Sequence, residues 1–214
     1  MNGNKTTAIS AERRTQRGIS VLAFFVPAFI MLVLFIIRGI YPFGDRSFLF
    51  SDMYHQYMPF LSEFVHKIKA GEGLFYSYNV GIGSNFLALY VYYLASPFSF
   101  LVALLPSAII TESLYVMILL KVGLAGATMG WYLQKTYPGK ERNVLFFSAM
   151  YALCAWSLTY GNNVMWLDTF LLFPLVIRGA DLLLSGKNWL FYTLMLGLTL
   201  LTHFYMGYMV CLFL

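Results

Sequence analysis

Charge is what this sequence has least of. Only 11% of the 214 residues are Asp, Glu, Lys or Arg, whereas 60% are hydrophobic. Soluble chains carry about 25% charged residues, so this chain has too few to cover a surface that faces water. The mean hydropathy of +0.70 agrees. We therefore expect an integral membrane protein whose first partner is the lipid bilayer.

Cysteine and histidine are also scarce. Cys154 and Cys211 both lie inside apolar stretches, which argues against a disulfide framework and against a thiolate metal site. The three histidines are too scattered to indicate a metal centre. The fourteen Lys and Arg residues are scattered along the chain and mostly flank apolar stretches. The net charge of +5 therefore indicates helix orientation in a bilayer, and we expect no nucleic-acid partner.

The apolar runs predict several membrane helices. We expect residues 1–18 to be a basic cytoplasmic leader and residues 19–40 to be an uncleaved first membrane helix, since Ile19 to Ile37 can cross about 30 Å of hydrocarbon. Residues 41–111 then form an outer loop. Four further membrane helices are expected over residues 112–133, 143–160, 165–184 and 189–214. Because the chain stops inside an apolar run, we expect a truncated chain and further spans beyond Leu214.

The segment 86–105 allows two topologies. If it crosses the membrane, the chain has six spans and the basic loop 134–142 lies outside. If it lies along the outer interface or re-enters, the chain has five spans and that loop stays in the cytoplasm. The positive-inside rule favours five spans. The tyrosines of the segment, Tyr90, Tyr92 and Tyr93, also prefer the headgroup zone.

The outer loop holds most of the candidate functional residues. Apolar residues recur at helical spacing from Tyr54 to Lys69 and predict an amphipathic helix at the membrane surface, which ends at Gly71 and Gly73. Asp52 lies just before this helix. Ser51 or Asp52 could cap the helix, or the Asp52 carboxylate could serve as a general base at the boundary of water and lipid. Spacing alone favours the cap.

A second part of the loop, residues 76–85, is rich in glycine and tyrosine. Gly83 and Asn85 precede an apolar helix, where free N–H groups could hold a phosphate. A simple turn and helix cap is the alternative, and spacing favours it. Tyr78 and its aromatic neighbours could stack on sugar rings or anchor the loop at the interface.

Two ionisable residues lie in or beside the predicted membrane helices. Lys121 falls inside the 112–133 span and needs an anionic partner or water, either from an acidic side chain or from a lipid phosphate. Asp168 lies at the outer mouth of a helix pair and could join the surface of Asp52 or be a loop-end residue in water. Gly126 and Gly130 have the spacing of closely packed membrane helices, which we interpret as packing only.

Three strings in the sequence carry a resemblance to a known family. They are SDMYHQYMPF at 51–60, YNVGIGSNF at 78–86 and YYLASPF at 92–98. With these strings the chain resembles the YfhO-like bacterial membrane proteins. Those proteins are similar to the GT-C class of glycosyltransferases, which use polyprenyl-phosphate sugars.

The resemblance implies a fold, a reaction and a site. The fold would be an all-α, polytopic helical bundle of GT-C type with interfacial helices in the first outer loop. It would lie in the bacterial plasma membrane and move a sugar from a polyprenyl-phosphate donor to an envelope acceptor such as a teichoic acid on the outer face. By analogy Asp52 is the catalytic residue. The expected substrate-binding residues are Arg46, His55, Gln56, Tyr57, Tyr78, Asn79, Gly83, Asn85, Lys121 and Asp168.

In this mechanism Asp52 accepts the proton of the acceptor hydroxyl while that oxygen attacks the anomeric carbon. The lipid phosphate then leaves with negative charge. Lys121, Arg46 or a divalent cation such as Mg²⁺ or Mn²⁺, coordinated by Asp52 and Asp168, could stabilise that charge.

Two other functions compete with an enzyme. A transporter or lipid flippase would also need polar residues and glycines within a helical bundle. A non-catalytic assembly protein could keep the same shape without chemistry. The unusual polar residues of this sequence gather toward one face, and the sequence shows no inverted repeat. Both observations argue against the transporter, and the assembly protein stays open.

Overall fold

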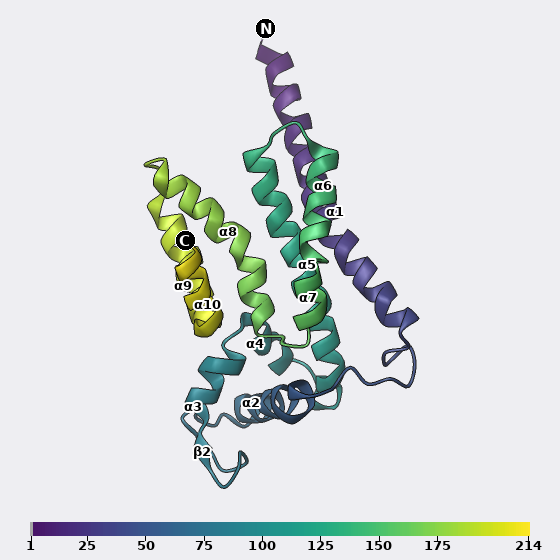
Figure 1. The fold of residues 1–214 in the computed structure, drawn as a ribbon, viewed down its shortest axis with the longest axis vertical. Helices are drawn as coiled ribbons and strands as arrows, with labels where there is room; N and C mark the ends of the chain where they lie inside the picture. Colours follow the sequence, from purple (N-terminus) through teal and green to yellow (C-terminus); the bar gives the residue numbers. More distant parts are fainter. Residues whose placement is uncertain (1) are drawn as a thin grey trace.

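A computed structural model of the protein describes residues 2–214, with side chains from Gly18 onward. The chain is almost entirely helical, with one two-stranded hairpin. A bundle of long helices stands on a layer of short elements at one end (Figure 1). We call residues 38–109 the loop layer, and we call α1 and the helices after residue 109 the bundle. The expected all-α membrane architecture is confirmed.

The first helix, α1 (Asn2–Ile37), runs without a break from the basic leader through the first apolar run. The segment Gly18–Ile37 of this helix is long and apolar enough to cross a membrane, and it is close to the run expected from the sequence. The leader is therefore continuous with the helix rather than a separate segment. The next residues turn at Gly39, whose φ is +62°, and enter the loop layer.

The loop layer contains eight short elements. They are the π-helical turn η1 (Met53–Tyr57), α2 (Met58–Ala70), β1 (Tyr76–Ser77), β2 (Ser84–Asn85), α3 (Phe86–Leu89), the π-helical turn η2 (Tyr90–Leu94), α4 (Pro97–Ala103) and the 3-10 turn η3 (Ser107–Ile109). Together η1 and α2 form the helix expected over 54–69. Its Leu61, Phe64 and Val65 are buried in the common core, and Gly71 ends it at a φ of +69°, as predicted.

The apolar segment 86–105 is not a straight helix. The pair α3–η2 and α4 meets at an angle of 109°. The side chain of Ser96 accepts a hydrogen bond from the N–H of Phe98, and Pro97 occupies the first turn of α4. Both features favour a new helix start at this point. The segment enters and leaves at the same end of the molecule (Figure 1), which is the geometry that the five-span arrangement requires.

Six helices complete the bundle: α5 (Ile110–Thr136), α6 (Glu141–Ala152), α7 (Ala155–Tyr160), α8 (Trp166–Leu184), α9 (Trp189–Thr202) and α10 (Phe204–Phe213). Among the described residues, three helical segments are long and apolar enough to cross a membrane: Gly18–Ile37, Ser107–Thr136 and Glu141–Tyr160. A fourth is added if the bent pair in the loop layer counts as one span. The number of spans stays a prediction.

The segment 189–214, expected as one helix, is two helices in the structure. At His203 the backbone is extended, with φ −162° and ψ 97°, and the ring Nδ1 accepts a hydrogen bond from the N–H of Met206. Gly207 packs closely on Leu200, so α10 folds back along α9. The expectation of one helix was wrong. Hydropathy is high on both sides of His203, and a hydropathy average does not detect the side-chain cap that starts a second helix.

The two ends of the bundle differ in what they carry. The start of α1, the turn 137–140 between α5 and α6, and the turn 185–188 between α8 and α9 lie at one end, and the loop layer lies at the other (Figure 1). The basic leader and the basic loop 134–142 therefore share an end, as the positive-inside rule favours.

The crossing of α1 and α5 depends on glycines. A Cβ added at Gly126 would overlap the carbonyl oxygen of Ala23 and lie 2.7 Å from Cγ of Pro27. A Cβ added at Gly130 would lie 2.8 Å from Cβ of Ala23. Small residues allow such close approach of membrane helices, so the packing role predicted for Gly126 and Gly130 is confirmed.

Replacing Gly126 with Ala should therefore destabilise the bundle. The added methyl group must separate α1 from α5, and overpacking of this kind costs about 1–3 kcal/mol. We expect a lower thermal unfolding temperature in detergent. The control is Gly197→Ala, because a Cβ at Gly197 meets nothing within 4 Å. Equal stability of the two variants would contradict the close crossing.

Candidate functional site

Asp52 is exposed and occupies the position just before η1, but its side chain makes no capping hydrogen bond. Instead its Oδ1 accepts a hydrogen bond of 3.1 Å from Nε2 of Gln56. The cap interpretation that spacing favoured is therefore wrong for Asp52. The preceding residue, Ser51, has a φ of +51°. Residues other than glycine rarely adopt this conformation, and such strain clusters at functional sites.

Two side chains of η1 fasten the Asp52 segment to other elements. The Oε1 of Gln56 accepts a hydrogen bond of 2.8 Å from the hydroxyl of Tyr93 in η2. The hydroxyl of Tyr57 donates a hydrogen bond of 2.7 Å to Oδ1 of Asn163, between α7 and α8. Burial raises the pKa of Tyr57, and the negative charge of Asp52 raises it further, so Tyr57 stays a protonated donor. The Asp52 segment is thus held from both sides.

Lys121 and Asp168 form an ion pair inside the protein. The Nζ of Lys121 lies 2.7 Å from Oδ2 of Asp168 and donates a second hydrogen bond of 2.9 Å to the carbonyl oxygen of Val164. The ammonium also lies 5.2 Å above the ring of Phe98. Only 1% of Lys121 and 2% of Asp168 are exposed. The partner that Lys121 required is therefore an acidic side chain, and Asp168 is not a loop-end residue in water.

The ion pair is also connected to the loop layer. The hydroxyl of Ser96 donates a hydrogen bond of 3.0 Å to Oδ1 of Asp168. Beside this contact lies a cavity of about 20 Å³, lined among others by Tyr57, Tyr93, Ser96 and Lys121. A cavity of this size holds about one water molecule. The tyrosines that fix the Asp52 segment and the buried ion pair therefore share one small cavity, which has no room for a lipid phosphate in this conformation.

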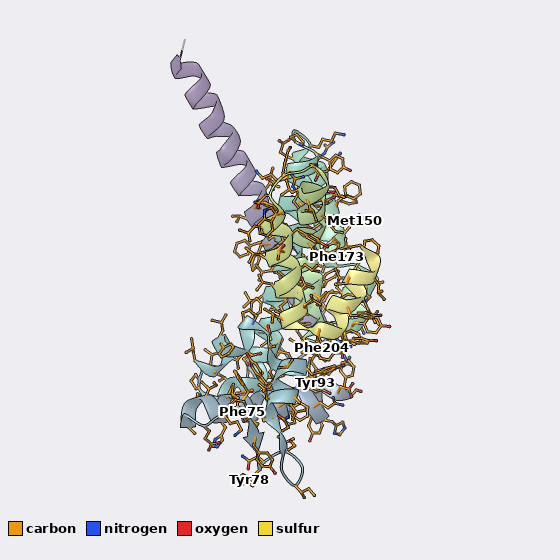
Figure 2. The ribbon with its side chains drawn as sticks, turned by 90° about the vertical axis from the view of Figure 1, so that its left-hand side faces the viewer. Phe75, Tyr78, Tyr93, Met150, Phe173 and Phe204 are labelled. Carbon is orange, nitrogen blue, oxygen red and sulfur yellow. The ribbon has the colours of Figure 1, made fainter. Side chains whose placement is uncertain are left out.

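The hairpin β1–β2 places the second group of candidates. Gly83 has a φ of +102°, and a Cβ there would overlap the hydroxyl of Tyr76, so glycine is required for the turn. The Oδ1 of Asn85 accepts a hydrogen bond of 3.3 Å from the N–H of Ala88 and caps α3. Because α3 has only four residues, the structure favours the turn and cap over the phosphate site. Tyr78 is 84% exposed near the hairpin tip, away from Tyr93 (Figure 2).

Glu63 was not singled out in the sequence, although it anchors the hairpin. Its Oε1 accepts a hydrogen bond of 2.6 Å from Ser77, and its Oε2 accepts one of 3.0 Å from Nδ2 of Asn79. Burial alone would raise the pKa of Glu63, but these hydrogen bonds and the charges of Lys67 and His66 outweigh burial and lower it. The only sequence signal was the Glu63–Lys67 spacing of four residues on a helix.

His55 and Asn79 meet at the same place. Both line a groove of about 480 Å³ between α2 and the hairpin, together with Glu63 and His66. The structure thus divides the candidates into three neighbouring groups. Asp52 directly precedes η1, which contains Gln56 and Tyr57. The Lys121–Asp168 pair lies at the small cavity that Tyr57 also lines, and His55 and Asn79 line the groove.

Arg46 does not join these groups. It is exposed in a loop closed by backbone hydrogen bonds from Arg46 to Gly39 and from Tyr41 to Arg46. It makes no ion pair with any residue whose side chain the structure describes.

A divalent cation shared by Asp52 and Asp168 does not fit the structure, because Asp52 is exposed and both carboxylate oxygens of Asp168 already accept hydrogen bonds. Over residues 18–214 no cluster of three or more His, Cys, Asp or Glu could hold a metal ion.

A family model described as bacterial membrane protein YfhO matches residues 23–214. The chain belongs to the YfhO family. The matched part contains the whole loop layer, Lys121 and Asp168, so the candidate site lies within the matched residues. No curated protein and no solved structure matches the chain. The resemblance expected from the three strings is confirmed at the level of the family.

The buried ion pair gives a direct stability test. Lys121→Met should leave Asp168 charged and unpaired in the interior, which costs about 3–5 kcal/mol. We expect a large drop in thermal unfolding temperature. The double variant Lys121→Met/Asp168→Asn removes both charges and should recover most of the loss. If Lys121→Met were as stable as wild type, the pairing of these side chains would be wrong.

Proposed function

We propose that this YfhO-family protein is a membrane glycosyltransferase of GT-C type. It moves a sugar from a polyprenyl-phosphate donor to a cell-envelope acceptor, such as a teichoic acid, on the outer face of the bacterial plasma membrane. The observation that carries the proposal is Asp52. This exposed carboxylate does not cap a helix, follows a strained residue, and is oriented by a chain of two hydrogen bonds from Tyr93 through Gln56.

The geometry supports a role as general base. Asp52 accepts the proton of the acceptor hydroxyl while the hydroxyl oxygen attacks the anomeric carbon of the sugar. The bond from that carbon to the phosphate oxygen breaks, and the lipid phosphate leaves with the electron pair. A base acts only if it is held within hydrogen-bond reach of the proton it removes. Gln56 and Tyr93 provide that orientation without neutralising the carboxylate.

The departing phosphate needs positive charge. Arg46 lies in the same loop layer, and its guanidinium makes no ion pair with any side chain that the structure describes. Lys121 is closer to the tyrosines of η1 and η2 through the shared cavity, but Asp168 neutralises it. In the proposed reaction Arg46 therefore supplies this charge, which requires it to approach the Asp52 segment from its separate loop at residues 39–46. Lys121 contributes only if the contact between Ser96 and Asp168 opens.

One observation favours a second candidate function, a transporter or lipid flippase. A fully buried Lys–Asp pair within a helical bundle is the kind of group that transporters use along a substrate path. A flippase would depend on Lys121 and Asp168, whereas the glycosyltransferase depends first on Asp52. The two functions therefore differ in which substitution is decisive.

Asp52→Asn tests the proposal. The amide keeps the size of the side chain and can still accept the hydrogen bond from Gln56, but it cannot take a proton. We expect sugar transfer to the envelope acceptor to fall by roughly 10²–10⁴-fold, the usual contribution of a general base, while the amount of protein in the membrane stays unchanged. Asp45→Asn is the matched control, since Asp45 is an exposed carboxylate in the same layer.

Transfer by Asp52→Asn at the rate of the Asp45→Asn control would remove Asp52 from the mechanism. A full-length protein that moves lipid across the bilayer and loses that activity in Lys121→Met would favour the flippase. If neither activity is detected in wild type, the non-catalytic assembly role is the remaining reading.

A further inference from the structure

The groove between α2 and the hairpin is built as a second polar site. Its volume of about 480 Å³ lies within the range of about 300–1,000 Å³ found for small-molecule sites. Glu63, only 9% exposed, lies in its wall and is held by Ser77 and Asn79. These two hydrogen bonds fix the hairpin against α2 without the help of a ligand.

The groove offers hydrogen-bonding groups of both kinds. A carboxylate has about four acceptor positions, and Ser77 and Asn79 use two of those on Glu63. The Oδ1 of Asn79 accepts no hydrogen bond from any described residue, since the amide of Asn79 is engaged through Nδ2. The rings of His55 and His66 add nitrogen atoms, and the ring of Phe60 adds an apolar face. A ligand with hydroxyl groups on a compact ring is complementary to these groups, because hydroxyl groups both donate and accept hydrogen bonds.

The charged side chains at and beside the groove favour an uncharged ligand over an anionic one. Lys67 is buried and lies 3.1 Å from Glu72 and 3.9 Å from Glu63, so one ammonium faces two carboxylates. Counted alone, these two carboxylates and one ammonium give the region a net negative charge. The net negative charge would repel a phosphate-rich acceptor polymer in the groove. An uncharged sugar would not be repelled.

The groove is continuous with the Asp52 segment. His55 lines the groove from η1, three residues after Asp52. Phe60 lines it as well, and its ring centroid lies 5.0 Å from that of Tyr93, the residue that orients Gln56. The groove therefore borders the turn η1 that directly follows Asp52, whose carboxylate the proposed reaction uses.

We propose that the groove lined by His55, Phe60, Glu63, His66 and Asn79 binds the uncharged sugar unit that is transferred from the lipid donor. This assignment rests on the proposed glycosyltransferase function and names its donor-sugar site. Glu63 accepts hydrogen bonds from sugar hydroxyls, Asn79 accepts through Oδ1, and Phe60 packs against the apolar face of the ring.

The test uses the full-length protein in lipid nanodiscs and saturation-transfer NMR. The probes are the neutral methyl glycosides of glucose, galactose and N-acetylglucosamine, with a glycerol phosphate trimer as the anionic comparison. Ser62→Trp places a large ring in the groove, because Ser62 lines it and its hydroxyl makes only a weak hydrogen bond of 3.5 Å, to the sulfur of Met58. Ala70→Trp puts the same ring on an exposed residue at the end of α2, outside the groove, and is the matched control.

We expect wild type, Ala70→Trp and Asp52→Asn to bind at least one neutral glycoside, and Ser62→Trp to bind it roughly tenfold or more weakly. His55→Ala, which removes an exposed ring at the edge of the groove, should weaken binding as well and guards against misfolding of Ser62→Trp. Unchanged binding in both groove variants, binding of the glycerol phosphate trimer at this site, or no glycoside binding by wild type would each overturn the assignment.

The two proposals fail in different ways. Glycoside binding that depends on the groove, without any Asp52-dependent transfer, keeps the sugar site and removes the glycosyltransferase. Asp52-dependent transfer that Ser62→Trp leaves at the wild-type rate keeps the enzyme and removes the sugar site from this groove.

Discussion

The buried ion pair between Lys121 and Asp168 is the interaction on which the rest of the structure depends. An ammonium and a carboxylate in an apolar bundle are each unfavourable alone, so the two must stay together. Their pairing fixes α5 against α8. The hydrogen bond from Ser96 to Asp168 then attaches the loop layer to that pair. One interaction between two helices thereby sets the position of the layer above them.

The candidate site follows from this attachment. Ser96 lies at the bend between η2 and α4, so holding Ser96 also holds Tyr93 in the preceding turn. Tyr93 orients Gln56, and Gln56 holds the carboxylate of Asp52. The chain of contacts thus runs from two charges in the interior to one carboxylate at the surface. Asp52 makes no direct contact with Lys121 or Asp168. We therefore expect a change at the ion pair to reach Asp52 through Ser96, Tyr93 and Gln56.

Periodicity and turn chemistry made part of this molecule predictable from its sequence. The first apolar run, the cap at Gly71 and the glycines at the α1–α5 crossing all follow from local spacing, and the three family strings contain Asp52, Gln56, Tyr93 and Ser96. The position of Lys121 inside an apolar run also indicated that it needs an anionic partner or water. The identity of that partner was not predictable, because Asp168 lies 47 residues away and only the packing of α5 on α8 brings it near. The groove at Glu63 has the same origin, since the hairpin folds back on α2.

Two expectations failed for local reasons. Asp52 has the sequence position of a helix cap, but the π-helical turn that follows it directs its side chain toward Gln56. His203 breaks an apolar run that hydropathy treats as one helix, because its ring caps the helix that follows. In both cases a single side-chain hydrogen bond decided the structure. Patterns averaged over several residues do not contain that information.

The central claim is that the loop layer with Asp52 faces the outside while the turn 137–140 faces the cytoplasm. Single cysteines placed at Ser47 and at Pro138, in a chain whose Cys154 and Cys211 are replaced by serine, test it with a membrane-impermeant maleimide on intact cells. Both positions are exposed, so accessibility depends on the side of the membrane. We expect Ser47→Cys to label readily and Pro138→Cys to label only after the membrane is permeabilised. Labelling of Pro138→Cys in intact cells would contradict the account.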